Sequence, residues 1–285
     1  GGTGGSDGLS ANTIFGYLAG EDIADGGVDN TYFGHKAGSN NATGDDNVFM
    51  GSNAGKGVHG NSNSRNVGIG SDCMLKITTG TENVAIGRTA MEDANTAAGN
   101  VAIGTECLMN LTDGTNNVAI GKVALNGAGV NPSNSVAVGY AAARYAEGNN
   151  NIALGLSALK GVSGFDGVNN IAIGYEALDA VTDGEEANIA IGYGSMGAVN
   201  ESASHHADAN IAIGYNALTG GTLTDGNLSH NIAIGYEALD ATGANDQLGT
   251  IAIGYAALGA LTSGVDNLAI GYQALDANTT GDGNL

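Results

Sequence analysis

Few residues of this chain have types and spacing that suit catalysis. Its 285 residues include two cysteines, Cys73 and Cys107, and five histidines, of which His205 and His206 are adjacent. Two thiols do not complete a four-ligand zinc shell, and we expect both to fill the core. The histidine pair is either a polar part of a loop or a metal ligand. The zinc-peptidase motif HExxH and the phosphate-binding loop GxxxxGK[ST] are both missing, so we expect no enzyme activity.

Acidic residues are the stronger candidates for binding chemistry. Four acids directly precede the Asn of a recurring motif, and three others lie in Thr-Asp-Gly turns. Oxygen-rich turns suit calcium, whereas an acidic solvated face needs no ligand, and both interpretations stay open. The seven calcium candidates are Asp29, Asp46, Glu82, Asp113, Asp183, Asp225 and Asp266.

Tyrosines recur after a glycine of the same motif and predict an aromatic stripe. Such a stripe can stack on itself, pack against a second chain or bind sugars. Since the residue at this position varies among Tyr, Ser, Thr, Lys and Arg, we expect the position to face solvent. The six consecutive members are Tyr175, Tyr193, Tyr215, Tyr236, Tyr255 and Tyr272.

An internal repeat positions all of these residues. The segment NIAIGYEAL, residues 170–178, recurs in fifteen copies that align on a glycine, and the copies are about 18 residues apart on average. The variation in length falls between the end of one copy and the Asn of the next. Self-similarity at a period of this size is typical of solenoids.

The first position of the repeat predicts a ladder of side-chain amides. It is Asn in thirteen of the fifteen copies, the exceptions being Ser135 and Thr250. If the coils stack in register, each amide bonds to the next, as in other in-register β structures. The alternative is a turn residue before a strand. The predicted central members are Asn83, Asn100, Asn117, Asn151, Asn170, Asn188, Asn210 and Asn231.

The next three positions predict a short strand, for example residues 232–234, with apolar side chains on both faces. This pattern is typical of a parallel strand that is covered on both sides. In the first three copies a larger residue replaces the central Ala of the strand, and Gly replaces the Leu four positions after the conserved glycine. The exchange, seen with Tyr32 and Gly38 or Phe49 and Gly55, predicts that the two positions touch in one core.

The predicted fold class is all-β. We expect a parallel β-solenoid, a β-roll or β-helix, of about 15 coils averaging about 18 residues, with one short NxAIG strand per coil. The connecting loops are too short for a crossover helix of usual length, so we expect at most a short helical turn after the strand. No change in composition marks a domain boundary, and residues 1–285 are predicted to form one continuous repeat array.

The charge excludes one class of partner. The chain carries 29 acidic and eight basic residues, with a formal net charge of −21. A phosphate backbone would be repelled, so nucleic acid is not expected as a partner. No run of 18 apolar residues is present, and membrane insertion is not expected either.

The repeat resembles known families. Copies such as NTIFGYLAG (residues 12–20) and NVFMGSNAG (residues 47–55) resemble the tandem repeats of phage tail-fibre-like and bacterial surface proteins. The VAIG portion, residues 84–87, resembles the head repeats of trimeric autotransporter adhesins, which are β-rolls. The resemblance implies an extracellular location, on a cell or virion surface, and a trimeric fibre.

We therefore expect a structural repeat segment of an extracellular fibre or filament, stiffened by coil stacking. Its partners would be copies of itself, end to end or as a trimer. The alternative is a trimeric phage tail-fibre or bacterial adhesin shaft that binds host surface glycans through the tyrosine stripe or the loops. No cofactor is required in either case, and Ca²⁺ is the candidate metal.

Overall fold

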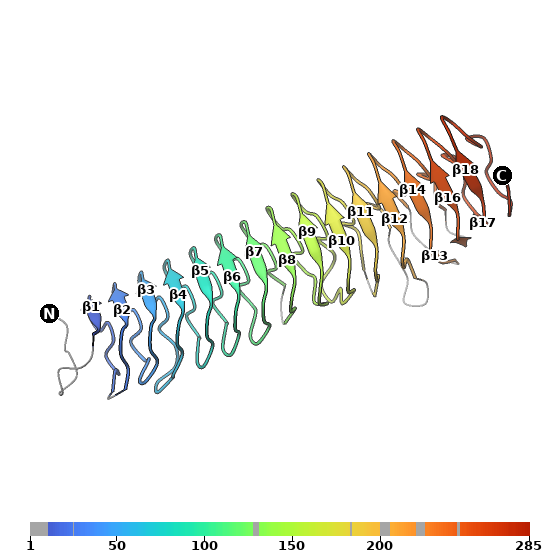
Figure 1. The fold of residues 1–285 in the computed structure, drawn as a ribbon. Coiled ribbons are helices and arrows are strands. Elements are labelled where there is room, and N and C mark those ends of the chain that lie inside the picture. Colours follow the sequence, from blue (N-terminus) through green and yellow to red (C-terminus); the bar gives the residue numbers. More distant parts are fainter. Residues whose placement is uncertain are drawn as a thin grey trace. The chain divides into compact units, whose positions relative to one another are not determined.

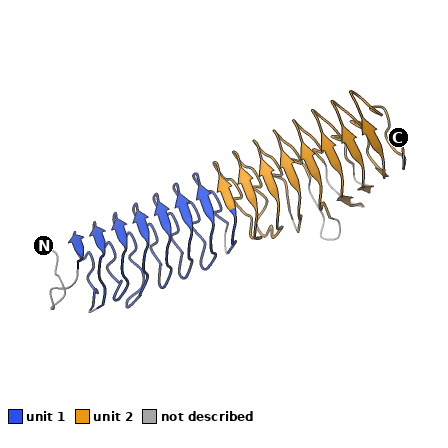
Figure 2. Ribbon diagram, in the orientation of Figure 1, with its two compact units in different colours: residues 1–135 blue, residues 136–285 orange. Residues whose placement is uncertain are grey.

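A computed structural model describes residues 11–24, 26–127, 131–182, 184–199, 206–220, 226–243 and 246–285. These residues form strands, turns and loops and contain no helix, so none of them supplies a helix able to cross a membrane. The chain divides into two compact units, residues 1–135 and 136–285 (Figure 2). Each unit is a parallel β-solenoid with coils of roughly 18 residues, which confirms the predicted fold class. The single continuous array over residues 1–285 stays a prediction.

Unit 1 contains one three-residue strand per coil, and its strands pair in parallel in chain order (Figure 1). Equivalent residues face each other, as Ala85 faces Ala102. The strands are β1 (Thr13–Phe15), β2 (Thr31–Phe33), β3 (Val48–Met50), β4 (Val67–Ile69), β5 (Val84–Ile86), β6 (Val101–Ile103) and β7 (Val118–Ile120).

Unit 2 repeats this arrangement and adds a second small parallel sheet on its loop side. Its main strands are β8 (Val136–Val138), β9 (Ile152–Leu154), β10 (Ile171–Ile173), β11 (Ile189–Ile191), β12 (Ile211–Ile213), β14 (Ile232–Ile234), β16 (Ile251–Ile253) and β18 (Leu268–Ile270). The small sheet pairs β13 (Leu228–Ser229), β15 (Gln247–Leu248) and β17 (Gly264–Val265).

The core of each coil lies behind the central residue of its strand. Ala102 and Leu108 are both fully buried in one coil, and Phe49 is fully buried in another. A side chain added at Gly55 would overlap the ring of Phe49. Gly55 and Leu108 have nearly the same φ, 57° and 48°, so the backbone accepts either residue at this position. The predicted exchange of large and small residues within one core is therefore present.

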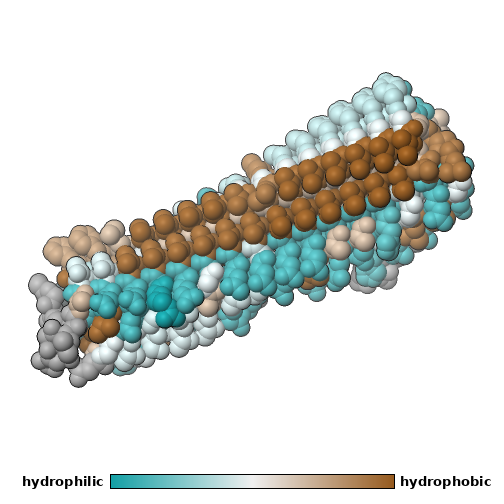
Figure 3. All heavy atoms as spheres, viewed as in Figure 1, coloured by the Kyte–Doolittle hydropathy of each residue, from teal (hydrophilic) through white to brown (hydrophobic). Residues whose placement is uncertain are grey.

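The prediction that both faces of the strand are covered is wrong. The central residues are buried, but the first and third residues point outward, and Ile86 and Ile213 are 37% and 36% exposed. In the space-filling view of Figure 3, hydrophobic atoms form two adjacent rows along the strands of each unit. We call these two outward columns, the first and third residues of the main strands, the strand face.

The predicted helical turn after the strand is also wrong. In the coil that contains β10, the segment after Gly174 includes Glu176 and Leu178, whose φ values are 49° and 51°. An α-helix contains no positive φ values. The backbone N–H groups of these two residues donate to Leu156 and Ser195, in the coils before and after, at 3.0 and 2.9 Å. Hydrogen bonds that a helix would make within the segment are made between coils instead.

The aligned glycine ends each strand for a steric reason. Gly174 has a φ of 138°, a region that is essentially restricted to glycine. A Cβ at this position would also overlap the carbonyl oxygen of Gly192 in the next coil. Both the backbone conformation and the close stacking of coils therefore exclude a side chain.

The exchange of large and small residues in the core predicts that substitutions at Phe49 and Gly55 offset each other's effect on stability. Phe49→Ala leaves a cavity and should lower the free energy of unfolding by about 3 kcal/mol. Gly55→Leu overpacks the core and should cost about 2 kcal/mol or more. The double variant recreates the Ala and Leu pair of later coils, and chemical denaturation should show it within about 1–2 kcal/mol of the parent.

The control for this cycle is Phe49→Ala combined with Gly60→Leu. Gly60 also has positive φ, 77°, but a Cβ there meets no atom within 4 Å. The changes in the free energy of unfolding that these two substitutions cause should be additive. If the Phe49→Ala/Gly55→Leu pair also showed simple addition, the two positions would not share a core.

Candidate functional site

A ladder of asparagine side chains runs along each unit at the start of the strands. In unit 1, the backbone N–H and the Nδ2 of Asn100 both donate to Oδ1 of Asn83 at 3.0 Å. The Nδ2 of Asn100 also donates to the carbonyl of Gly114, in the next loop, at 2.9 Å. Both amides are fully buried. Each asparagine thus joins the coil before it to the loop after it.

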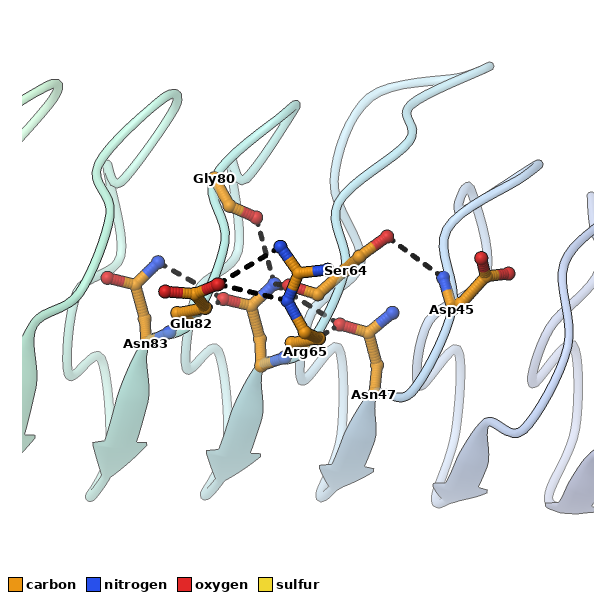
Figure 4. Close-up of polar contacts among 8 residues, drawn as sticks. Asp45, Asn47, Ser64, Arg65, Gly80, Glu82 and Asn83 are labelled. Carbon is orange, nitrogen blue, oxygen red and sulfur yellow. Dashed lines mark hydrogen bonds and ion pairs between the residues drawn. The ribbon is translucent and has the colours of Figure 1, made fainter.

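The structure brings all eight predicted ladder residues into such contacts. In unit 1, Asn30, Asn47 and Asn66 extend the same series toward the N-terminus, and Figure 4 shows Asn47 and Asn83 at the starts of their strands. In unit 2, each Oδ1 from Asn151 to Asn210 accepts the side-chain amide of the next asparagine at 3.1–3.3 Å. The side-chain amide of each predicted member also donates to a backbone carbonyl further along the chain, and these members are Asn83, Asn100, Asn117, Asn151, Asn170, Asn188, Asn210 and Asn231.

Thr250 interrupts the ladder in unit 2. Its backbone N–H still donates to Oδ1 of Asn231 at 2.9 Å. Its hydroxyl oxygen, however, is buried without a hydrogen-bond partner. The ladder resumes at Asn267, whose Oδ1 accepts both the backbone N–H and the Nδ2 of Asn284.

The acids that precede the ladder share one backbone conformation. Asp29, Asp46, Glu82 and Asp266 all have positive φ, between 55° and 62°. Asn, Asp and Gly adopt this left-handed conformation most readily, and Asn116 and other asparagines take the same position elsewhere. Calcium at these acids stays a hypothesis, but it is not needed to explain why they recur.

The calcium candidates that the structure describes do not gather at one place. Glu82 forms an ion pair with Arg65 at 3.0 Å across neighbouring coils (Figure 4), and Asp113 donates its backbone N–H to Oδ1 of Asn131. Asp183 and Asp225 lie outside the described residues, as does His205. In the part of the chain that the structure describes, no three His, Cys, Asp or Glu side chains gather closely enough to hold a metal ion.

The two cysteines are core residues in separate coils of unit 1. Both are free and fully buried, and burial raises the pKa of each thiol to about 12. The thiols of Cys73 and Cys107 lie 3.2 Å from the carbonyl oxygens of Ala85 and Ala119, in the next coil. Because the reactive form of cysteine is the thiolate, neither residue is suited to nucleophilic chemistry.

The six predicted stripe tyrosines of unit 2 form a continuous stack, here called the tyrosine ladder. Consecutive ring centroids are 4.9–5.2 Å apart and the ring planes differ by 6–12°. The rings are 40–74% exposed, as expected for a column that faces solvent. Each internal ring has a neighbour on both faces, so solvent meets its edge and its hydroxyl. Sugars commonly pack on an open aromatic face, and the internal rings of this stack offer none.

Two short glycine patterns match the spacing of known functional motifs. Gly192, Gly194 and Gly197 have the spacing GxGxxG after strand β11, but turns follow in place of the helix that a dinucleotide-binding loop requires. Residues 4–8, GGSDG, have the spacing GxSxG of a nucleophile elbow and lie outside the described residues.

His206 is the member of the adjacent histidine pair that the structure describes. Its backbone N–H donates to Oδ1 of Asn227.

Carboxylates beside the tyrosine ladder have perturbed acidity. Burial, together with repulsion from Glu176, raises the pKa of Asp179 to about 6. Burial and Glu237 raise the pKa of Asp240 in the same way, three coils further along unit 2. These pairs concentrate negative charge at the turn that follows each of these two strands.

Comparison with protein-family models, curated proteins and solved structures gives no match to this chain. The resemblance to tail-fibre and adhesin repeats therefore rests on the short motif. What the chain does has to be argued from the geometry of the ladders and of the strand face.

The interruption at Thr250 predicts a stabilising substitution. Thr250→Asn restores an amide that can donate to Asn231 and accept from Asn267, and it removes the unpaired hydroxyl. The free energy of unfolding should rise by about 1 kcal/mol or more, measured by chemical denaturation. Thr250→Val removes the hydroxyl without adding an amide and should give a smaller gain. A destabilised Thr250→Asn variant would contradict the role assigned to the ladder.

The raised pKa of Asp179 predicts that the stability of unit 2 depends on pH. This raised pKa means that the folded state binds the proton more tightly than the unfolded state, so stability rises as pH falls through about 6. Asp179→Asn should therefore stabilise unit 2 at pH 8, by about 1 kcal/mol after solvent screening, and give no gain at pH 4. Denaturation at both pH values checks this, and Glu176→Gln should give a smaller gain of the same sign. An equal effect at both pH values would contradict the prediction.

Proposed function

We propose that the chain is a structural repeat segment of an extracellular fibre or filament, and that its units associate side by side with copies of the same chain. The observation that carries the proposal is the strand face, which is apolar, regular and exposed. The coils behind it are joined by buried amides and by backbone hydrogen bonds, an arrangement that suits mechanical support.

The strand face is unusually extensive for a monomer. The first and third residues of the main strands include no charged residue in either unit. In unit 2 the third residues include Val138, Ile213 and Ile270, which are 37%, 36% and 65% exposed. With strands about 4.8 Å apart, eight coils give a strip roughly 40 Å long. Contiguous apolar patches of this extent mark interaction surfaces more often than free surface.

A second copy of the chain is the occupant that fits this surface best. The side chains form ridges that repeat once per coil, and another array with the same rise can place its ridges in the grooves along the whole strip. Most other surfaces would match a few coils at most. Every acid that the structure describes lies outside the strand face, so apposed strand faces bring no like charges of these residues into direct contact.

The alternative is a trimeric tail-fibre or adhesin shaft that binds host glycans. The tyrosine ladder supports it weakly, because the internal ring faces are covered by neighbouring rings. Glycan contacts would have to use ring edges, hydroxyls or loops. Glycan-array binding that falls in Tyr215→Ser and Tyr236→Ser variants would favour this alternative.

Side-by-side association predicts sensitivity to charge on the strand face. In Ile213→Lys, association would bury an unpaired ammonium group, which is costly. Sedimentation velocity should show dimers or larger assemblies of the parent chain, and at least tenfold weaker association of Ile213→Lys. The proposed contact would be wrong if the parent stayed monomeric at high micromolar concentration.

A matched control separates the strand face from net charge. Asn216→Lys adds the same charge in the same coil, at a turn position where another coil already carries Lys36 with the same positive φ. Its assemblies should resemble those of the parent. Equal loss of association in both variants would indicate an effect of the added lysine that does not depend on the strand face, and it would contradict the proposed contact.

A further inference from the structure

We propose that the tyrosine ladder is an oxidative modification site, at which a peroxidase-type oxidant joins neighbouring tyrosines as dityrosine and covalently staples adjacent coils of unit 2. This inference does not depend on the fibre proposal, because the reacting rings belong to one chain. It needs the ladder geometry, a preference of the oxidant for these rings and a path for the released protons.

The geometry holds the reacting groups in place before the reaction. The five consecutive ring pairs from Tyr175 to Tyr272 are nearly parallel, with centroids about 5 Å apart. The bond in dityrosine joins the carbon next to the hydroxyl on one ring to the same carbon on the other. In an in-register stack the equivalent carbons of neighbouring rings follow one another along the stack, and rotation of both rings about their Cβ–Cγ bonds turns their edges together for coupling. Holding reactants this close replaces a bimolecular encounter.

The tyrosines are also the most accessible oxidisable groups of unit 2. Residues 136–285 contain no cysteine and no tryptophan, and their methionine, Met196, is fully buried. The ladder rings, by contrast, expose their edges and hydroxyls along the surface. Tyr140 is exposed as well, but the equivalent residue of the next coil is Leu156, so Tyr140 lacks a ring to couple with in that coil.

Carboxylates stand beside two of the phenols. Hydrogen bonding to Glu176 raises the pKa of Tyr175, and hydrogen bonding to Glu237 raises that of Tyr236. A carboxylate that already accepts a hydrogen bond from the phenol is placed to take its proton when the electron leaves. Radical formation at these positions then does not leave a high-energy cation.

The reaction balances with hydrogen peroxide as the oxidant. Each of two phenols loses one electron and one proton, which gives two neutral phenoxyl radicals. The radicals form one carbon–carbon bond, and proton shifts restore both phenols. The two electrons and two protons reduce one hydrogen peroxide molecule to two water molecules. The product has lost two hydrogen atoms and links residues that are 17 to 22 positions apart in the sequence, such as Tyr255 to Tyr272 and Tyr193 to Tyr215.

The experiment treats the dilute chain with a haem peroxidase and hydrogen peroxide. We expect dityrosine fluorescence from material that still migrates as a monomer, with a mass loss of two hydrogen atoms per cross-link. Peptide mapping should place the cross-links between consecutive ladder tyrosines. Cross-linked protein should also denature at a higher denaturant concentration. Cross-links that form mainly between chains would overturn the proposal.

Two triple variants provide the decisive comparison. Tyr193→Phe, Tyr236→Phe and Tyr272→Phe together keep every ring in the stack but leave no two neighbouring phenols, so the intrachain yield should fall at least tenfold. The matched control, with Tyr17→Phe, Tyr140→Phe and Tyr145→Phe, removes three tyrosines outside the ladder and should keep the parental yield. Equal yields from the two variants would contradict the assignment to the ladder. Neither readout depends on whether chains associate through the strand face.

Discussion

The structure of each unit depends on the buried asparagine ladder. An asparagine side chain both donates and accepts, so one Oδ1 can take the backbone N–H and the Nδ2 of the next asparagine while its own Nδ2 bonds a loop carbonyl. Aspartate lacks the donors, and threonine at this position leaves its hydroxyl unpaired, as Thr250 shows. A slip of one residue in any coil would leave several buried amides unpaired at once, which fixes the register.

A fixed register forces equivalent residues to share an environment, and the other columns follow from this. The carbonyl of Gly192 lies where a Cβ of Gly174 would be, so every coil needs glycine there. Residues such as Glu82 and Leu178 must adopt positive φ to turn the chain within a single coil height. The strain at Glu82 and Leu178 is offset by their backbone N–H groups, which donate to the carbonyls of Ser64 and Ser195 in neighbouring coils.

Features that arise from stacking equivalent residues could be predicted from the sequence, and features that depend on what lies outside a coil could not. The asparagine column, the parallel pairing and the exchange of Phe49 with Gly55 are visible as column patterns. The exposure of the strand face is not visible in this way, because a β-branched residue such as Ile213 gives the same sequence pattern whether its outer side is buried or exposed. The residues EAL after Gly174 favour a helical turn locally, but the backbone N–H groups of this segment bond to other coils, which the propensity of single residues does not show. The acids before the ladder were ambiguous, since the same residues suit calcium and left-handed turns.

The column after the aligned glycine shows how the two units use the same position differently. Six of the eight basic residues lie in unit 1, where Arg88 pairs with Glu106 of the next coil at 2.9 Å, an exposed contact of small net value. Unit 2 is rich in acids and has few bases to pair with them, and there the column carries tyrosines. Stacked rings contribute about 0.5–1.5 kcal/mol per pair without needing an opposite charge. An acidic array can therefore reinforce this column by aromatic stacking, where ion pairs would need bases that unit 2 largely lacks.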